Sequence, residues 1–177
     1  MKYSGIIKND LAAAPGVCTT LFVQGCPIKC PGCHNKETWD KDGGEPFTEE
    51  TFEKIKEALT ANGIKRTFCI MGGEPLAEYN AHAVRDLIGR LKEEMPHLKV
   101  WVWSGYTFDN LYTTKNTDII KILWDVDGLV TGPFIEEKRN VTLRFRGSSN
   151  QEVWMKNEAG LFYRLEFNDG GTTELKN

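Results

Sequence analysis

Apolar residues occur along the chain in short blocks of two alternating kinds. Continuous runs of β-branched and other apolar residues, typical of buried strands, occupy residues 17–24, 66–71, 98–103 and 127–131. Blocks with apolar residues at helical spacing fall between these runs, at residues 48–61, 84–95 and 118–124. Because strands alternate with helices, the pattern predicts right-handed βαβ units on a parallel sheet.

The ends of the predicted helices carry local signals. Thr48 is a suitable N-cap residue, and Glu49 and Glu50 behind it suit the positive end of a helix dipole. Pro96 cannot continue a helix, so it marks the end of the second one. The first unit of the fold is therefore expected to be a strand, a long loop and a helix.

The length of the chain limits the architecture. With 177 residues it can form one domain with its own core, but a complete (β/α)8 barrel needs about 250 residues. After Phe134 the pattern changes to short strand-like stretches at 141–145, 152–156 and 161–167, and the last two are expected to pair as a hairpin. The sequence predicts an α/β fold, a partial (β/α) barrel or a small open sheet, with a small β-rich C-terminal extension.

Composition narrows the class of protein. The net charge of −3 and the isoelectric point near 5.7 provide no basic stripe, so a nucleic-acid partner is not expected. Met1 is followed by no apolar signal segment, and the longest apolar runs, such as residues 21–23, are too short to span a membrane. Five cysteines, three of them crowded into one loop, favour a reducing compartment over a disulfide framework. We expect a cytoplasmic protein without a membrane partner.

The segment GCPIKCPGC places Cys26, Cys30 and Cys33 at C-x3-C-x2-C spacing. Thiolates bind zinc or iron-sulfur clusters, and closed structural sites usually have four protein ligands. Three thiolates can hold three irons of a 4Fe-4S cube and leave the fourth iron without a protein ligand, which suggests chemistry rather than structure. Two alternatives stay open at this point: a zinc site with His34 as fourth ligand, and a loop of unliganded thiols. Adjacent residues rarely direct their side chains at one ion, which disfavours the zinc site.

The two other cysteines differ from these three. Cys18 and Cys69 lie within apolar strand patterns, where a small buried thiol is the usual role of cysteine. We expect both to belong to the core.

Glycine-bearing turns follow three of the predicted strands: GCPIKCPGC, MGGEP and WSGY. The carboxyl ends of parallel strands meet at one edge of a sheet, so these turns are expected to lie together. Gly72 and Gly73 allow a ligand to approach the backbone closely, and Glu74 can accept hydrogen bonds from an ammonium group. A ligand on the open iron is therefore expected to carry an ammonium group.

These motifs together resemble the radical S-adenosylmethionine superfamily, and within it the family of activating enzymes of anaerobic ribonucleotide reductase. The resemblance rests on TLFVQGC, CPGCHNKETW, MGGEPL, WVWSGY and FRGSSNQ, in that order, and covers about residues 14–151. It implies a partial (β/α) barrel of the radical S-adenosylmethionine type at 1–151, with 152–177 as a C-terminal β-hairpin extension of the same domain.

The resemblance also implies a mechanism. In this family the amino and carboxylate groups of S-adenosylmethionine bind the fourth iron, and one electron from the cluster splits the sulfonium to give a 5′-deoxyadenosyl radical. That radical takes a hydrogen atom from a glycine in the C-terminal loop of the partner, an anaerobic ribonucleotide reductase, and leaves a glycyl radical. The implied cofactors are a 4Fe-4S cluster and S-adenosylmethionine, and a reduced flavodoxin-like or other protein would donate the electron.

Site residues follow from matching the motifs position by position. The resemblance implies that the cluster ligands are Cys26, Cys30 and Cys33, with no catalytic residue beyond the cluster and the bound S-adenosylmethionine. The cofactor-binding residues that it implies are Gly72, Gly73 and Glu74 for the methionine end, Gly32, Cys33 and His34 for the adenine, and Ser104.

Several questions stay open in the sequence. One alternative function is another small radical S-adenosylmethionine enzyme acting on a small molecule, of the 7-carboxy-7-deazaguanine synthase type, and a second is a non-catalytic iron-sulfur module. Arg146 and Asn150 in the RGSSNQ segment suit either docking of the substrate glycine or a turn with a surface salt bridge.

Overall fold

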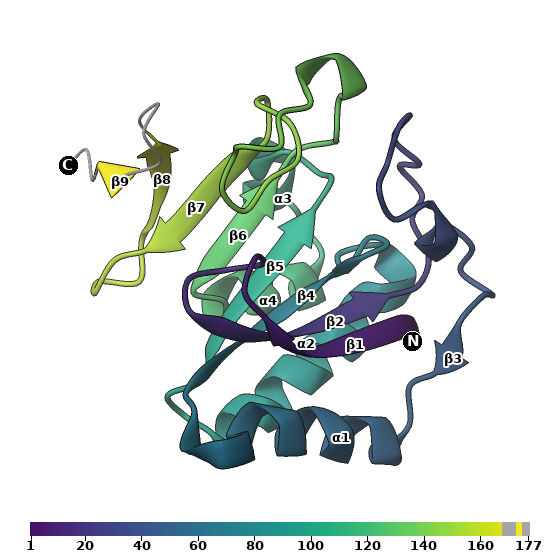
Figure 1. Cartoon of the computed structure of the whole chain (residues 1–177), viewed down its shortest axis with the longest axis vertical. Coiled ribbons are helices and arrows are strands. Elements are labelled where there is room, and N and C mark those ends of the chain that lie inside the picture. The colour runs from purple at the N-terminus through teal and green to yellow at the C-terminus, as the bar shows by residue number, and fades with distance from the viewer. Residues whose placement is uncertain (168–172, 175–177) are drawn as a thin grey trace.

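The computed structural model describes residues 1–167 and the backbone of 173–174 (Figure 1). The strands are β1 Lys2–Asp10, β2 Val17–Val23, β3 Glu45–Pro46, β4 Arg66–Gly72, β5 Lys99–Ser104, β6 Gly128–Thr131, β7 Glu152–Lys156, β8 Phe162–Phe167 and β9 Thr173–Glu174. The helices are α1 Glu49–Thr60, α2 Glu78–Glu94, α3 Phe108–Tyr112 and α4 Thr117–Asp125, with short 3-10 turns at Lys36–Thr38, Ala61–Gly63 and Glu136–Lys138.

All of these strands form one mixed sheet in the order β3-β1-β2-β4-β5-β6-β7-β8-β9. The four central strands β2, β4, β5 and β6 are parallel, and antiparallel strands flank them on both sides. The prediction of an α/β fold with a parallel centre is confirmed. Within the described residues the sheet does not close, because β3 and β9 lie at opposite ends of the strand order.

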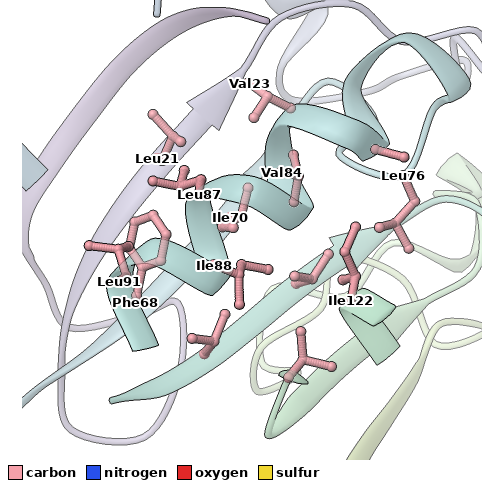
Figure 2. Close-up of a cluster of buried hydrophobic side chains, with 14 of the residues drawn as sticks. Leu21, Val23, Phe68, Ile70, Leu76, Val84, Leu87, Ile88, Leu91 and Ile122 are labelled. Atoms are coloured by element: carbon pink, nitrogen blue, oxygen red, sulfur yellow. The ribbon is translucent and has the colours of Figure 1, made fainter. Parts of the chain in front are cut away.

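Alternate residues of the central strands serve two separate cores. Phe68 and Ile70 of β4 point to the face covered by α1, α2 and α4, where they pack against Leu87 and Ile88 of α2 (Figure 2). Cys69 points to the opposite face, where it packs in a second cluster with Trp101, Val130 and Val153. Cys18 joins this second cluster, and both thiols are fully buried, so the prediction of two core cysteines is confirmed. The period of two along a strand places one cluster on each side of the sheet.

The start of α1 has the predicted cap. The Thr48 hydroxyl accepts a hydrogen bond from the Thr51 backbone N–H at 3.4 Å, and the Thr51 hydroxyl accepts one from the Thr48 N–H at 3.3 Å. This reciprocal pair satisfies two of the N–H groups that a helix N-terminus leaves without partners.

Replacing Thr48 by alanine should lower the free energy of unfolding by about 1 kcal/mol, because the Thr51 N–H loses its acceptor. Replacement by serine keeps the hydroxyl and should cost much less. Chemical denaturation of the two variants and the wild type measures both effects. Equal losses in the two variants would show that the methyl group, and not the cap, stabilises the helix.

The structure differs from the predicted elements at three places. Residues 141–145 do not form a strand, because the Asn140 side-chain oxygen accepts hydrogen bonds from the Thr142 N–H and hydroxyl and turns the chain there. Val141 is consequently 82% exposed instead of packed in a sheet. Two elements were not predicted: β1, which is half exposed and mixes polar with apolar residues, and the five-residue helix α3.

The C-terminal hairpin is present as predicted. β7 pairs antiparallel with β8, and β7 also pairs with β6, so the hairpin continues the main sheet. The parts of the expected extension at 168–172 and 175–177 lie outside the described residues. Every helix in the part of the chain that the structure describes is too short or too polar to cross a bilayer.

Candidate functional site

A cavity of about 170 Å³ lies at the carboxyl ends of the parallel strands. Loops that follow β2, β4, β5 and β6 all contribute to it, and Figure 1 shows these loops gathered beyond the ends of the strands. Its lining residues are Cys26, Ile28, Cys30, Cys33, His34, Asn35, Met71, Gly72, Gly73, Glu74, Trp103, Ser104, Gly105, Gly132, Phe134, Gly147 and Gln151. The three predicted turns therefore meet in one place. We call this space the cysteine cavity.

The three clustered cysteines are free thiols, and all are partly exposed in the cysteine cavity. Burial raises the pKa of the Cys26 and Cys30 thiols, although backbone N–H groups donate hydrogen bonds to both sulfurs and lower it in part. For Cys30 the first such donor is Phe134, which lies far along the chain, after β6. Because metals bind thiolates, a metal centre here would release these protons as it forms.

The thiols are not arranged around a single metal ion. Among the described residues, no group of three or more His, Cys, Asp or Glu side chains is placed to hold one ion. A zinc site needs all its sulfur ligands at about 2.3 Å from the same ion, whereas each thiolate on a cubane binds a different iron. The three thiols and His34 line this one cavity.

The turn after β4 is joined to the start of the cysteine loop. The Gly73 N–H donates to the Val23 carbonyl at 2.8 Å, and the Glu74 N–H donates to the Gly25 carbonyl at 2.8 Å. Gly72 has a φ of 100°, and a Cβ at Gly73 would collide with the Gly25 carbonyl oxygen. The two glycines are thus required by the close approach of two loops, in addition to any ligand.

Glu74 is 1% exposed, and its carboxylate links two strand-end turns. One oxygen accepts hydrogen bonds from the Leu76 N–H and the Ser104 hydroxyl, both at 2.9 Å, and the other accepts one from the Gly105 N–H at 2.7 Å. Burial raises the pKa of Glu74 to about 7 despite these three donors. The predicted binding residues Glu74 and Ser104 therefore lie in direct contact with each other at the edge of the cavity.

Gly32 is placed differently from the other predicted site residues. It does not line the cysteine cavity, whereas its neighbours Cys33 and His34 do. Its φ is 70°, and a Cβ there would lie 2.6 Å from the carboxyl carbon of Glu136. The 3-10 turn at Glu136–Lys138 thus rests against the cysteine loop, and a side chain at position 32 would displace it.

The segment between β6 and β7 forms a wall of the cysteine cavity that sequence reasoning did not identify. The Gln151 side-chain oxygen accepts hydrogen bonds from the Gly147 N–H at 2.9 Å and the Ser148 N–H at 3.1 Å. Its amide nitrogen donates to the Gly132 carbonyl at 3.1 Å. Gln151 thereby ties the two ends of the segment together, and the only signal in the sequence was its place in the RGSSNQ motif.

The roles of Arg146 and Asn150 are partly resolved. Arg146 donates to the Gln151 carbonyl at 2.8 Å, and the Asn150 amide nitrogen donates to the Pro133 carbonyl at 2.8 Å. These bonds agree with a turn-forming role. The Asn150 side-chain oxygen is buried without a hydrogen-bond partner among the described residues.

Comparison with known proteins places the chain in a family. Residues 12–154 match the protein-family model described as "4Fe-4S single cluster domain". The match covers most of the chain and includes all three cysteines of the cavity. The chain therefore belongs to this family of domains with a single 4Fe-4S cluster, in agreement with the predicted cofactor.

Similar proteins of known name narrow the family further. The anaerobic ribonucleoside-triphosphate reductase-activating protein of Escherichia coli K12 is 37% identical over 154 residues, which are 86% of this chain and 97% of that protein. The proteins of the same name from Vibrio cholerae and from enterobacteria phage T4 are 37% and 33% identical over 86% and 87% of this chain, and over 97% and 94% of their own lengths. The chain belongs to the anaerobic ribonucleoside-triphosphate reductase-activating proteins.

Proposed function

We propose that this protein activates an anaerobic ribonucleotide reductase by reductive cleavage of S-adenosylmethionine at a 4Fe-4S cluster. The observation that carries the proposal is the meeting of three free thiols with the Gly72–Glu74 turn in one cavity, in a chain whose relatives are reductase-activating proteins. When bound, the cluster supplies the electron that cleaves S-adenosylmethionine, so that a 5′-deoxyadenosyl radical can take a hydrogen atom from a glycine of the reductase.

In this proposal Cys26, Cys30 and Cys33 hold the cluster. The donor set fits it, because three thiols line one cavity while no further cysteine does so among the described residues. The backbone N–H of Phe134 and those near Cys26 donate to the sulfurs, and such bonds tune the potential of iron-sulfur clusters. We also propose that the open sheet is a partial barrel of the radical S-adenosylmethionine type, comprising 1–151 with 152–177 as an extension of the same domain.

The cysteine cavity would hold S-adenosylmethionine beside the thiols. Gly72, Gly73 and Glu74 would bind its methionine end, since the glycines leave the backbone accessible and the Glu74 carboxylate can accept a bond from an ammonium group. The backbone of Gly32, Cys33 and His34 would contact the adenine, with only Cys33 and His34 lining the cavity itself. Ser104 would act with Glu74, to which its hydroxyl already donates.

The proposed partner is the reductase, presenting a glycine in a C-terminal loop. A reduced flavodoxin-like protein, or another donor of low potential, would supply the electron. Both interactions suit a cytoplasmic protein, which is also what the free thiols favour.

One experiment tests the proposal. The protein is reconstituted anaerobically with iron and sulfide, reduced, and mixed with S-adenosylmethionine, first alone and then with the reductase encoded in the same genome. We expect 5′-deoxyadenosine by chromatography and a glycyl radical by electron paramagnetic resonance. Protein that holds a 4Fe-4S cluster but yields no 5′-deoxyadenosine would refute the proposal, as would stoichiometric zinc without iron or sulfide. Formation of 5′-deoxyadenosine without a glycyl radical would favour a small-molecule substrate.

A further inference from the structure

Two apolar side chains of the central strands form one side of the cysteine cavity. Met71 of β4 and Trp103 of β5 line it, and their strands are neighbours in the sheet. Each residue follows two positions after a member of the second core cluster, Cys69 or Trp101, and both pack against that cluster. They therefore lie on the face of the sheet opposite to α1, α2 and α4. We call Met71 and Trp103 the floor of the cysteine cavity.

The floor is the apolar surface of the cavity that comes from the sheet itself. The two other large apolar side chains of the lining, Ile28 and Phe134, belong to loops. A Cβ at Gly105 would lie 2.6 Å from Ile28, so this side chain already packs on another loop. The Phe134 ring packs in the same way against Gly147, at 3.2 Å from the position of a Cβ. A ligand with one polar and one apolar end would thus place its apolar end on the floor.

Contacts outside the cavity fix the orientation of Trp103. Its indole N–H donates to the Phe145 carbonyl at 2.8 Å. Its ring lies 5.9 Å from the Trp101 ring, between centroids, with an angle of 35° between the two planes. Because the N–H already has an acceptor, the part of Trp103 that can contact a ligand is the apolar ring. A ring that is held in place loses little conformational entropy when a ligand packs against it.

Phe145, which holds Trp103, has an unusual backbone conformation. Its φ is 63°, in the left-handed region that costs free energy for a residue with a Cβ. Two contacts stabilise it there: its carbonyl accepts the Trp103 N–H, and its ring meets the Trp101 ring at 5.4 Å. Residues in such conformations cluster at functional sites. The segment between β6 and β7 thus orients Trp103 in addition to forming a wall of the cavity.

We propose that the Trp103 ring binds the adenosyl part of S-adenosylmethionine. This inference rests on the proposed function, which assigns the methionine end of the ligand to the Gly72–Glu74 turn and leaves the planar base for the apolar floor. Bases stack on aromatic side chains because every base has a π-face. Among the described residues the lining has two other aromatic rings, those of His34 and Phe134, and both belong to loops. Trp103 is the largest of the three and lies on a strand, where binding groups are held more precisely than on loops.

The test measures ligand binding without turnover, on reconstituted protein whose cluster is left oxidised. Trp103→Leu removes the aromatic ring, and Trp103→Met is a second non-aromatic variant, because leucine also changes the packing against Trp101. Either of the two suffices if circular dichroism shows that it is folded. Trp103→Phe keeps a ring but lacks the indole N–H. Trp154→Leu is the matched control, since Trp154 is also partly buried and donates its N–H, to Thr131 at 3.2 Å, but does not line the cysteine cavity.

Isothermal titration gives the affinities for S-adenosylmethionine, S-adenosylhomocysteine and methionine, of which the second lacks the positive charge on sulfur. We expect the non-aromatic variants to bind both adenosyl compounds about tenfold more weakly or worse, and by similar factors, because the base loses its stacking partner. Methionine should bind within about twofold of the wild type. Trp103→Phe should lose less than about threefold, and Trp154→Leu should match the wild type for all three compounds.

The outcomes separate this inference from the proposed function. If the wild type neither binds S-adenosylmethionine nor cleaves it when reduced, the proposed function is wrong and the inference falls with it. If the wild type does both and the non-aromatic variants bind the adenosyl compounds as the Trp154→Leu control does, Trp103 only packs in the core although the function stands. Weaker binding of S-adenosylmethionine alone would place Trp103 at the charged sulfur, and weaker binding of methionine would place it at the methionine end. Either result overturns the inference.

Discussion

Replacing Cys30 by alanine is expected to reduce 5′-deoxyadenosine formation to background. Cys30 lines the cavity with Cys26 and Cys33, so its loss removes one of the three proposed cluster ligands. The proposed cluster already has one iron without a protein ligand. Without Cys30 a second iron would have none, and the cluster would not keep its geometry. The measurements are the product yield, the iron and sulfide content, and the paramagnetic resonance signal of the reduced protein.

Cys69→Ala is the matched control. Cys69 is fully buried on β4 in the second core cluster and does not line the cysteine cavity, and its hydrogen bond with Cys18 together with burial raises the pKa of its thiol. Removing its sulfur should cost about 1 kcal/mol of stability and leave iron content and cleavage unchanged in soluble protein. Equal loss of cleavage in both variants would mean that the assignment of the thiols is wrong.

The sequence signal is strongest for the strands that are buried on both faces. β2, β4 and β5 are covered on both faces, so their residues are mostly apolar or β-branched and their pattern is strong. β1 lies outside them with one face largely exposed, and its sequence KYSGIIKND carries no clear period. The opposite error arose at 141–145, where a strand-like run follows an asparagine whose side chain turns the chain.

Some parts of the candidate site could also be predicted from the sequence, and others could not. Its three turns could be placed together from the sequence because parallel strands bring their carboxyl ends to one edge, whatever the loops contain. Phe134 and Gln151 could not be placed at the site from the sequence. They belong to the segment between β6 and β7, whose path depends on side-chain hydrogen bonds such as the one from Gln151 to Gly132. The burial of Glu74 could not be predicted from the sequence either, since its partners Ser104 and Gly105 follow about thirty residues later.

Glu74→Leu is expected to lower the free energy of unfolding by at least about 3 kcal/mol. The leucine fills a similar volume but leaves the Leu76 N–H, the Gly105 N–H and the Ser104 hydroxyl without their acceptor, and each such loss costs about 1–3 kcal/mol. Glu74→Gln keeps one acceptor oxygen and should lose less. Denaturant titration of both variants at pH 7.5 measures the difference, and equal stability of Glu74→Leu and the wild type would show that the carboxylate does not join the two turns.

The same carboxyl group predicts a pH dependence of stability. Its pKa is raised from 4.5 to about 7 in the folded chain, so between these values the folded protein keeps a proton that the unfolded chain releases. The contribution of Glu74 to stability is fully present below pH 4.5 and is lost as the pH rises to about 7, by about 3 kcal/mol at ~1.4 kcal/mol per unit. Glutamine does not titrate, so Glu74→Gln should not lose stability in this way. Its free energy of unfolding relative to the wild type should therefore be higher at pH 7.5 than at pH 5.0, as measured by denaturation at both pH values.

The affinity for the ligand should depend on pH in the opposite direction to the stability. An ammonium group at Glu74 favours the ionised carboxylate, so S-adenosylmethionine should bind more weakly to the wild type as the pH falls below about 7. In Glu74→Gln this slope should disappear, because no carboxyl group remains to ionise. Isothermal titration of the reconstituted protein at pH 6.0 and 7.5 provides the measurement. The same slope in both proteins would mean that the buried carboxyl group stabilises the turns without contacting the ligand.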